Sequence, residues 1–167
     1  MENTKKSTLS FLLPYALGLL VVRLLIDTLI KQLELGYDGE SYGSYISFII
    51  EVALIFVTIN NFKKFQNNNQ LKFTEGIKIG VGLLLIVGVI FSIYLVIHGK
   101  YIDPTYQERL TEEAIKKLNT VNPEANTEML KKGQSGSIIG LFISILKYIF
   151  IGVLGGIISS AILKTEH

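Results

Sequence analysis

Four long apolar stretches alternate with polar segments along this chain of 167 residues. The stretches cover residues 11–30, 45–60, 77–97 and 137–163. An α-helix needs about 20 mainly apolar residues to cross the hydrocarbon core of a bilayer. The second stretch is shorter, and the residues just before it supply a further turn. The pattern predicts an all-α integral membrane protein, a single domain over residues 1–167 with four transmembrane helices.

The first stretch resembles an export signal at first sight, because Lys5 and Lys6 precede it. It is longer than the roughly 7–15 apolar residues of a signal core, and no small-x-small cleavage motif follows it. We therefore expect a retained first transmembrane helix.

The lysines of the short connections predict the orientation, because cytoplasmic loops are enriched in Lys and Arg. Lysines precede the first stretch, occur without any acid in residues 61–72 and follow the last stretch. Residues 31–44 instead carry Lys31 against three acidic side chains. We expect both termini in the cytoplasm and the long segment 98–136 on the outer side of the membrane.

The outer segment 98–136 has the features of a helical hairpin. Asp103 suits an N-cap, and Pro104 suits the first helical position after it. Apolar residues then recur at every fourth position: Tyr106, Leu110, Ala114 and Leu118. A second short helix fits residues 122–133, ending at a glycine. The hairpin would cover the outer membrane surface or the bundle; the alternative is a solvated helix pair without a specific role.

Three pieces of sequence are similar to one known family: LKFTEGIKIGVGL before the third stretch, IHGKYIDPTYQE after it, and GVLGGIISSAILK in the fourth. With the charged helical segment between them, they resemble the four-helix bacterial membrane family catalogued as domain of unknown function 4199, found mainly in Bacteroidota. The resemblance covers residues 10–164 and is strongest from Leu71 onward. It implies a four-span protein of the bacterial inner (cytoplasmic) membrane, and it carries over no activity and no catalytic residue.

Besides Lys78 at the very start of the third stretch, four charged side chains interrupt the apolar stretches: Arg23, Asp27, Glu51 and Lys147. Each costs roughly 2.5–3.5 kcal/mol on insertion scales, so such groups normally find partners or a polar cavity. Counted from the outer ends of the stretches, three of them lie about 6–10 residues deep, and Asp27 lies near the outer boundary. We expect Arg23 to face Glu51, with Lys147 close enough to share a carboxylate. Asp27 would bond Arg23 locally or receive Lys147.

The four charges of this predicted cluster sum to zero. The first interpretation is therefore a structural network that fixes the register of the helices. One alternative is a functional site, either a proton-coupled carboxylate or a polar ligand pocket. The other is a docking site for a partner helix that carries its own charge.

Small residues at four-residue spacing predict a helix-packing seam, because they let two backbones approach closely. The series comprises Gly152, Gly156 and Ser160 in the fourth stretch and Gly76 and Gly80 in the third. We expect packing within the chain; a seam between two copies or with a partner is the alternative.

Signals for enzymatic chemistry are missing from the sequence. The absence of cysteine excludes thiol nucleophiles and thiolate metal sites. His98 and His167 are far apart, and we interpret His98 as an interfacial residue rather than a base. The chain has no catalytic or nucleotide-binding motif in a suitable context, and a net charge of +2 without a basic run does not indicate nucleic-acid binding. We expect no cofactor, no metal and no enzymatic activity.

Two hypotheses for the function remain. The first is a non-enzymatic scaffold or accessory subunit, bound in the lipid bilayer to a protein partner or to another copy of itself. The alternative is a small ion- or proton-coupled transporter-like protein that uses the intramembrane charge cluster.

Overall fold

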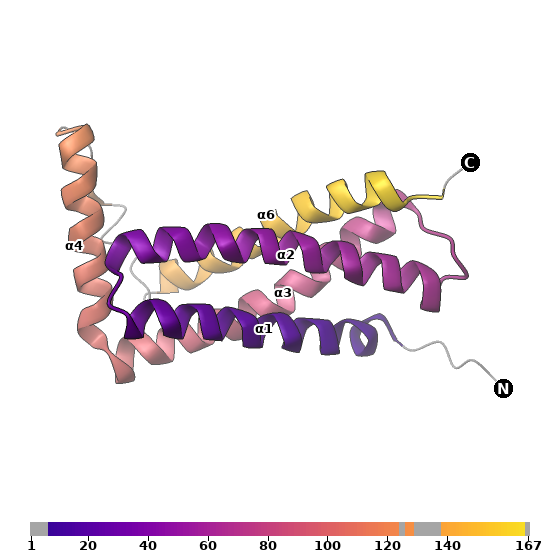
Figure 1. Cartoon of the computed structure of the whole chain (residues 1–167), viewed down its shortest axis with the longest axis horizontal. Coiled ribbons are helices and arrows are strands. Elements are labelled where there is room, and N and C mark those ends of the chain that lie inside the picture. The colour runs from indigo at the N-terminus through magenta and orange to yellow at the C-terminus, as the bar shows by residue number, and fades with distance from the viewer. Residues whose placement is uncertain (1–6, 124–125, 129–137, 166–167) are drawn as a thin grey trace.

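The computed structural model describes residues 7–123, 126–128 and 138–165. These residues form helices: α1 (Thr8–Gln32), α2 (Gly36–Gln66), α3 (Phe73–Ile97), the π-helix η1 (His98–Ile102), α4 (Pro104–Val121) and α6 (Ile138–Leu163) (Figure 1). The helices α1, α2, α3 with its extension η1, and α6 are long and apolar enough to cross a membrane. The prediction of an all-helical chain with four membrane-length helices is confirmed.

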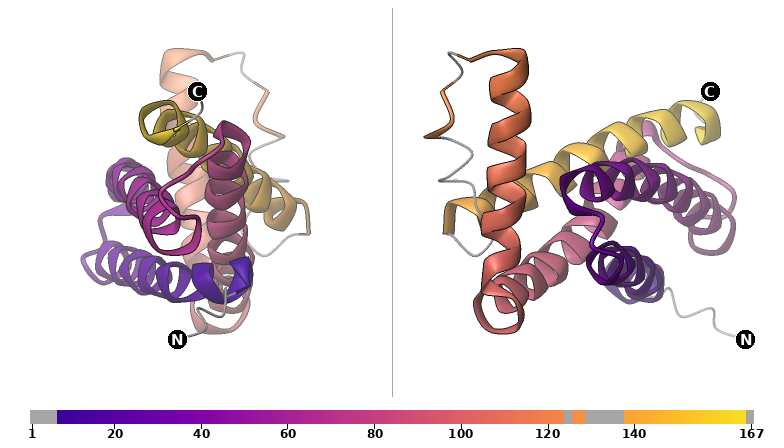
Figure 2. Two further views of the ribbon diagram at one scale, coloured as in Figure 1. Left: turned by 90° about the vertical axis from the view of Figure 1, so that its right-hand side faces the viewer. Right: turned by 60° about the vertical axis from the view of Figure 1, so that its left-hand side comes forward.

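The four long helices form a bundle whose end is crossed by α4 (Figure 1). Helix α1 packs against α2 and α3, and α6 packs against α3 and α2. Isoleucine, leucine and valine side chains fill the core: Ile55, Ile59, Leu83, Leu84 and Val87. The start of α1 and the end of α6 lie together at the end of the bundle opposite α4 (Figures 1 and 2). We call this end of the bundle the terminal end, and the end crossed by α4 the α4 end.

The start of α2 differs from the prediction. The helix begins at Gly36 rather than near residue 45, so residues 33–35 alone connect it to α1. The connection is tight, with Glu34 at φ +50° and Gly36 at φ +59°, a conformation that favours glycine. The residues after it are rich in Gly, Ser and acids and resemble a loop in sequence. They are helical here, and in the first turn Glu113 of α4 accepts a hydrogen bond from the backbone N–H of Tyr37 (2.7 Å).

Helix α4 begins where the sequence predicts. Asp103 is its N-cap and accepts a hydrogen bond from the backbone N–H of Tyr106 (3.0 Å), with Pro104 in the first turn. The residues before it continue α3 as a π-helix, so segment 98–136 is helical from its start. The second helix of the expected hairpin, residues 122–133, lies largely outside the described residues and stays a prediction.

The residues of the predicted packing seam lie where α3 meets α6: Gly76, Gly80, Gly152, Gly156 and Ser160. A Cβ atom on Gly80 would lie 2.6 Å from the carbonyl oxygen of Gly152, and one on Gly156 would lie 2.8 Å from the Cα of Ile77. Both separations are too short for real atoms. The two backbones therefore approach within a distance that only glycine permits.

Candidate functional site

A buried group of polar side chains lies between α1, α3 and α4 at the α4 end. Asp27 is 6% exposed, and its Oδ2 accepts hydrogen bonds from Lys31 Nζ (2.6 Å) and from the hydroxyl of Tyr94 (2.8 Å). The ammonium of Lys31 lies 5.2 Å from the ring centroid of Tyr94 and 5.4 Å from that of Tyr106. The Tyr106 hydroxyl donates to Glu40 of α2 (2.8 Å). We call these five residues the outer polar cluster.

The outer polar cluster holds its charges out of water. Asp27 stands four residues before Lys31 on α1, the favourable order for a helical ion pair. The two aromatic rings beside Lys31 contribute cation–π attraction, which is stronger in a desolvated site. Removing one partner of a buried ion pair leaves the other charge uncompensated, so each member depends on the others.

His98 lies next to this cluster at the junction of α3 and η1. Its ring centroid is 5.8 Å from that of Tyr94 and 6.2 Å from that of Tyr106. The side chain is buried, and its Nδ1 has no hydrogen-bond partner within the described part of the chain. His98 therefore belongs to the aromatic layer under α4.

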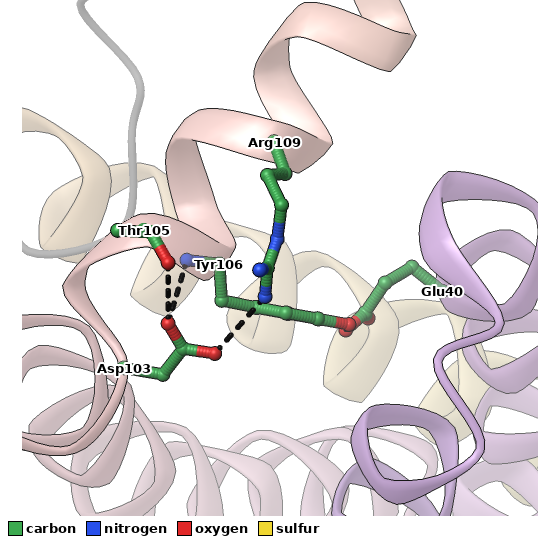
Figure 3. Close-up of polar contacts among 5 residues, drawn as sticks. All are labelled: Glu40, Asp103, Thr105, Tyr106 and Arg109. Atoms are coloured by element: carbon green, nitrogen blue, oxygen red, sulfur yellow. Dashed lines mark hydrogen bonds and ion pairs between the residues drawn. The ribbon is translucent and has the colours of Figure 1, made fainter.

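The first turn of α4 forms a second set of polar contacts, shown in Figure 3. Asp103 accepts hydrogen bonds from the Thr105 hydroxyl (2.9 Å) and from Arg109 (3.2 Å), besides the N–H of Tyr106. The Thr105 hydroxyl, the Tyr106 N–H and the Arg109 charge hold the pKa of the Asp103 carboxyl below its usual value. Burial, together with the hydrogen bond to Glu40, raises the pKa of Tyr106, which keeps this hydroxyl a hydrogen-bond donor.

Three contacts attach α4 to the beginning of α2. Besides the Tyr106–Glu40 hydrogen bond and the Glu113–Tyr37 contact, Lys117 forms an ion pair with Asp38. A pocket of about 280 Å³ lies beneath α4; its lining includes Lys31, Glu34, Asp103, Arg109 and Glu113. Charges of both signs line it, so it selects no single class of ligand by charge.

A third group of charges lies deeper in the bundle. Glu51 of α2 is 2% exposed, and the charges of Arg23 on α1 and Lys147 on α6 both act on it. The Arg23 guanidinium lies 5.0 Å from the ring centroid of Phe91, and its Nε is buried without a hydrogen-bond partner in the described residues. The charge of Arg23 also acts on Tyr148 of α6. We call Arg23, Glu51 and Lys147 the inner trio.

The four charges that the sequence groups together thus divide between two places. Asp27 binds Lys31 in the outer polar cluster, rather than Arg23 or Lys147. Arg23, Glu51 and Lys147 lie within electrostatic range of one another, but among the described residues no ion pair joins them. The trio carries one negative and two positive charges. The charge of Glu40 also acts on Lys147, although the two side chains form no ion pair.

Lys31 is the important residue that sequence reasoning assigned to a loop. It lies in the last turn of α1, because the helix runs to Gln32. The signal was present, since Asp27 and Lys31 have the spacing and order of a helical ion pair. Among the residues that the structure describes, no group of three or more His, Asp and Glu side chains is arranged as a metal site requires.

Comparison with known proteins identifies the family of this chain. No curated protein and no solved structure matches the chain. One family model matches residues 14–165, nearly the whole chain. The chain belongs to the family described as a protein of unknown function (DUF4199).

Proposed function

We propose that this protein is a non-enzymatic scaffold or accessory subunit that binds a protein partner inside the membrane. The observation that carries the proposal is the position of Lys147. It is the tenth of the 26 residues of α6, in a helix that is otherwise almost wholly apolar, and its side chain is exposed on the surface of the bundle. It forms no hydrogen bond or ion pair with any described residue.

A lysine in this place is costly for a protein that is alone in the bilayer. An ammonium group at the centre of a membrane helix costs roughly 2.5–3.5 kcal/mol on insertion scales unless a partner or a polar cavity receives it. A second protein that supplies such a partner would offset this cost. The position of Lys147 therefore favours a role of α6 in binding a helix of another protein.

Co-purification tests the proposal. The full chain, tagged and expressed in its own cell at native level, is extracted in mild detergent, and its companions are identified by mass spectrometry. We expect a stoichiometric membrane companion. A lone monomer with no companion, also after cross-linking in intact membranes, would remove the basis of the proposed function.

A small ion- or proton-coupled transporter is the second candidate, and the observation that favours it is Glu51. This carboxylate lies at the middle of α2, in the fields of two cations from two other helices. Its 2% exposure counts against a water path to it. Proton flux measured with purified protein in liposomes decides between the two. A flux that the unchanged protein shows and that Glu51→Gln abolishes would favour transport.

For the membrane and its orientation we propose the bacterial inner membrane, with both termini cytoplasmic. The support is the shared position of the start of α1 and the end of α6, with lysines at that end: Lys63, Lys64, Lys72, Lys78 and Lys164. Alkaline phosphatase fused after residue 167 should be inactive, and the same enzyme inserted near residue 122 should be active.

A further inference from the structure

The first half of α6 has a continuous face of large side chains that the described chain does not cover. Its exposed residues follow at intervals of three and four: Ile139, Phe142, Ile143, Leu146 and Phe150. This spacing places them on one side of a helix. Lys147 lies at the edge of the same face, one turn after Ile143. Figure 2 shows this half of α6 turned away from α1 and α2.

The divergence of α6 from α2 explains why Lys147 is left at this edge. Lower in the bundle the two helices touch, where a Cβ atom on Gly155 would lie 2.6 Å from the side chain of Ile55. Two turns before Gly155, the side chain of Lys147 is exposed. Glu51, one turn before Ile55, is buried, and the charge of Arg23 acts on its carboxylate.

Among the described residues, the charges around this point do not form ion pairs with Lys147. Glu51 lies within electrostatic range of both Arg23 and Lys147. The other carboxylate that acts on Lys147 is Glu40, which accepts the Tyr106 hydroxyl toward the α4 end and forms no ion pair with Lys147. Lys147 is the exposed member of the trio, and its ammonium therefore lies at the surface of the bundle.

We infer that the face of α6 around Lys147 binds a transmembrane helix of a different protein, and that an Asp or Glu of that helix pairs with Lys147. The inference rests on the proposed function and adds the chemistry of the partner. The exposed aliphatic and aromatic side chains pack against the partner helix, and the carboxylate forms the ion pair that Lys147 lacks among the described residues.

A second copy of the chain does not supply a free carboxylate for Lys147. Asp27 and Glu51, the carboxylates within its apolar stretches, are 6% and 2% exposed and already lie beside cations of their own chain. A lipid phosphate does not pair with Lys147 either, because the residue lies too deep in the bilayer. Lys147 lies about 14 Å along the axis from the first residue of α6, in a hydrocarbon core about 30 Å thick.

Site-specific photo-cross-linking in living cells tests the inference. A photoreactive amino acid replaces Leu146 or Phe150 in the full chain, and Leu25, exposed on α1, is the control position. We expect one membrane protein to be captured from α6 and not from α1, through a transmembrane segment that contains an Asp or Glu. Lys147→Met should lower the adduct yield about tenfold or more, the effect of losing 1.4 kcal/mol. Lys147→Arg should retain it.

A charge swap gives the decisive result. Lys147→Glu should abolish the adduct, and replacing the partner's carboxylate with Lys should restore it, at membrane levels of both proteins verified by immunoblotting. The inference is overturned by an equal yield from Lys147→Met, by adducts only with another copy or with lipid, or by capture from α1 alone. In those cases a captured protein companion still supports the scaffold function. No adduct from any position, with a monomer in mild detergent, overturns both.

Discussion

The two ends of the bundle are held together by different chemistry. At the terminal end, α3 and α6 meet along glycine and serine, and two backbones touch. At the α4 end, ion pairs, tyrosine hydroxyls and cation–π contacts join α1, α2, α3 and α4. Apolar burial does not drive helices together in lipid, where the surroundings are as apolar as the side chains. Close backbone packing therefore joins α3 and α6 at the terminal end, and charged and polar contacts join the helices at the α4 end.

The largest effect is expected from Lys31→Met, which leaves the buried carboxylate of Asp27 without its cation. Breaking a buried ion pair in this way costs about 3–5 kcal/mol. Thermal unfolding in detergent, followed by size-exclusion chromatography, measures the loss. The double variant with Asp27→Asn removes both charges and should recover part of the stability. A single variant as stable as the unchanged protein would show that the pair does not hold the α4 end.

The next effect is expected from Gly80→Ala, which places a methyl group against the backbone of Gly152. Overpacking of this kind costs about 1–3 kcal/mol. Gly18→Ala on α1 is the matched control, because a Cβ atom there meets nothing within 4 Å. In the same thermal assay only Gly80→Ala should destabilise the protein. If the two variants behave alike, the seam does not hold α3 and α6 together.

A smaller effect is expected from Glu113→Gln, which weakens the acceptor of the Tyr37 N–H at the start of α2. Loss of such a charged cap costs about 1 kcal/mol. Hydrogen exchange measured by mass spectrometry should accelerate over residues 36–44. Glu112→Gln, the neighbouring and exposed residue, should leave the exchange unchanged. Equal protection in both variants would mean that α2 begins at Gly36 without help from α4.

The smallest effect is expected at low pH, where the carboxylate of Asp103 becomes protonated. The pKa of Asp103 is lowered in the folded state, so its contribution to stability is complete above the unfolded value near 3.8 and is lost as the pH falls through the lower folded value. The first turn of α4 should therefore exchange faster at strongly acidic pH. Asp103→Asn, which still caps a helix, should reduce this pH dependence. An unchanged pH profile in Asp103→Asn would assign the acid effect to another carboxyl.

Local signals predict much of this fold. The four long helices follow from runs of apolar residues, and α4 follows from Asp103 and Pro104, which act within one turn. The start of α2 does not follow, because the N–H of Tyr37 in its first turn is satisfied by Glu113, 76 residues later in the chain. The partner of Asp27 depends on where α1 ends: once the helix reaches Gln32, Lys31 lies within it and becomes available.

The seam between α3 and α6 has a consequence for the synthesis of the protein. The 66 residues from 98 to 163 separate the end of α3 from the end of α6. At about 5–20 residues per second, a ribosome needs roughly 3–13 seconds to make them. Through that interval the glycine face of α3 lies in the membrane without its partner. An insertase or a lipid must cover it until the last helix arrives, so the order of translation decides when this bundle can close.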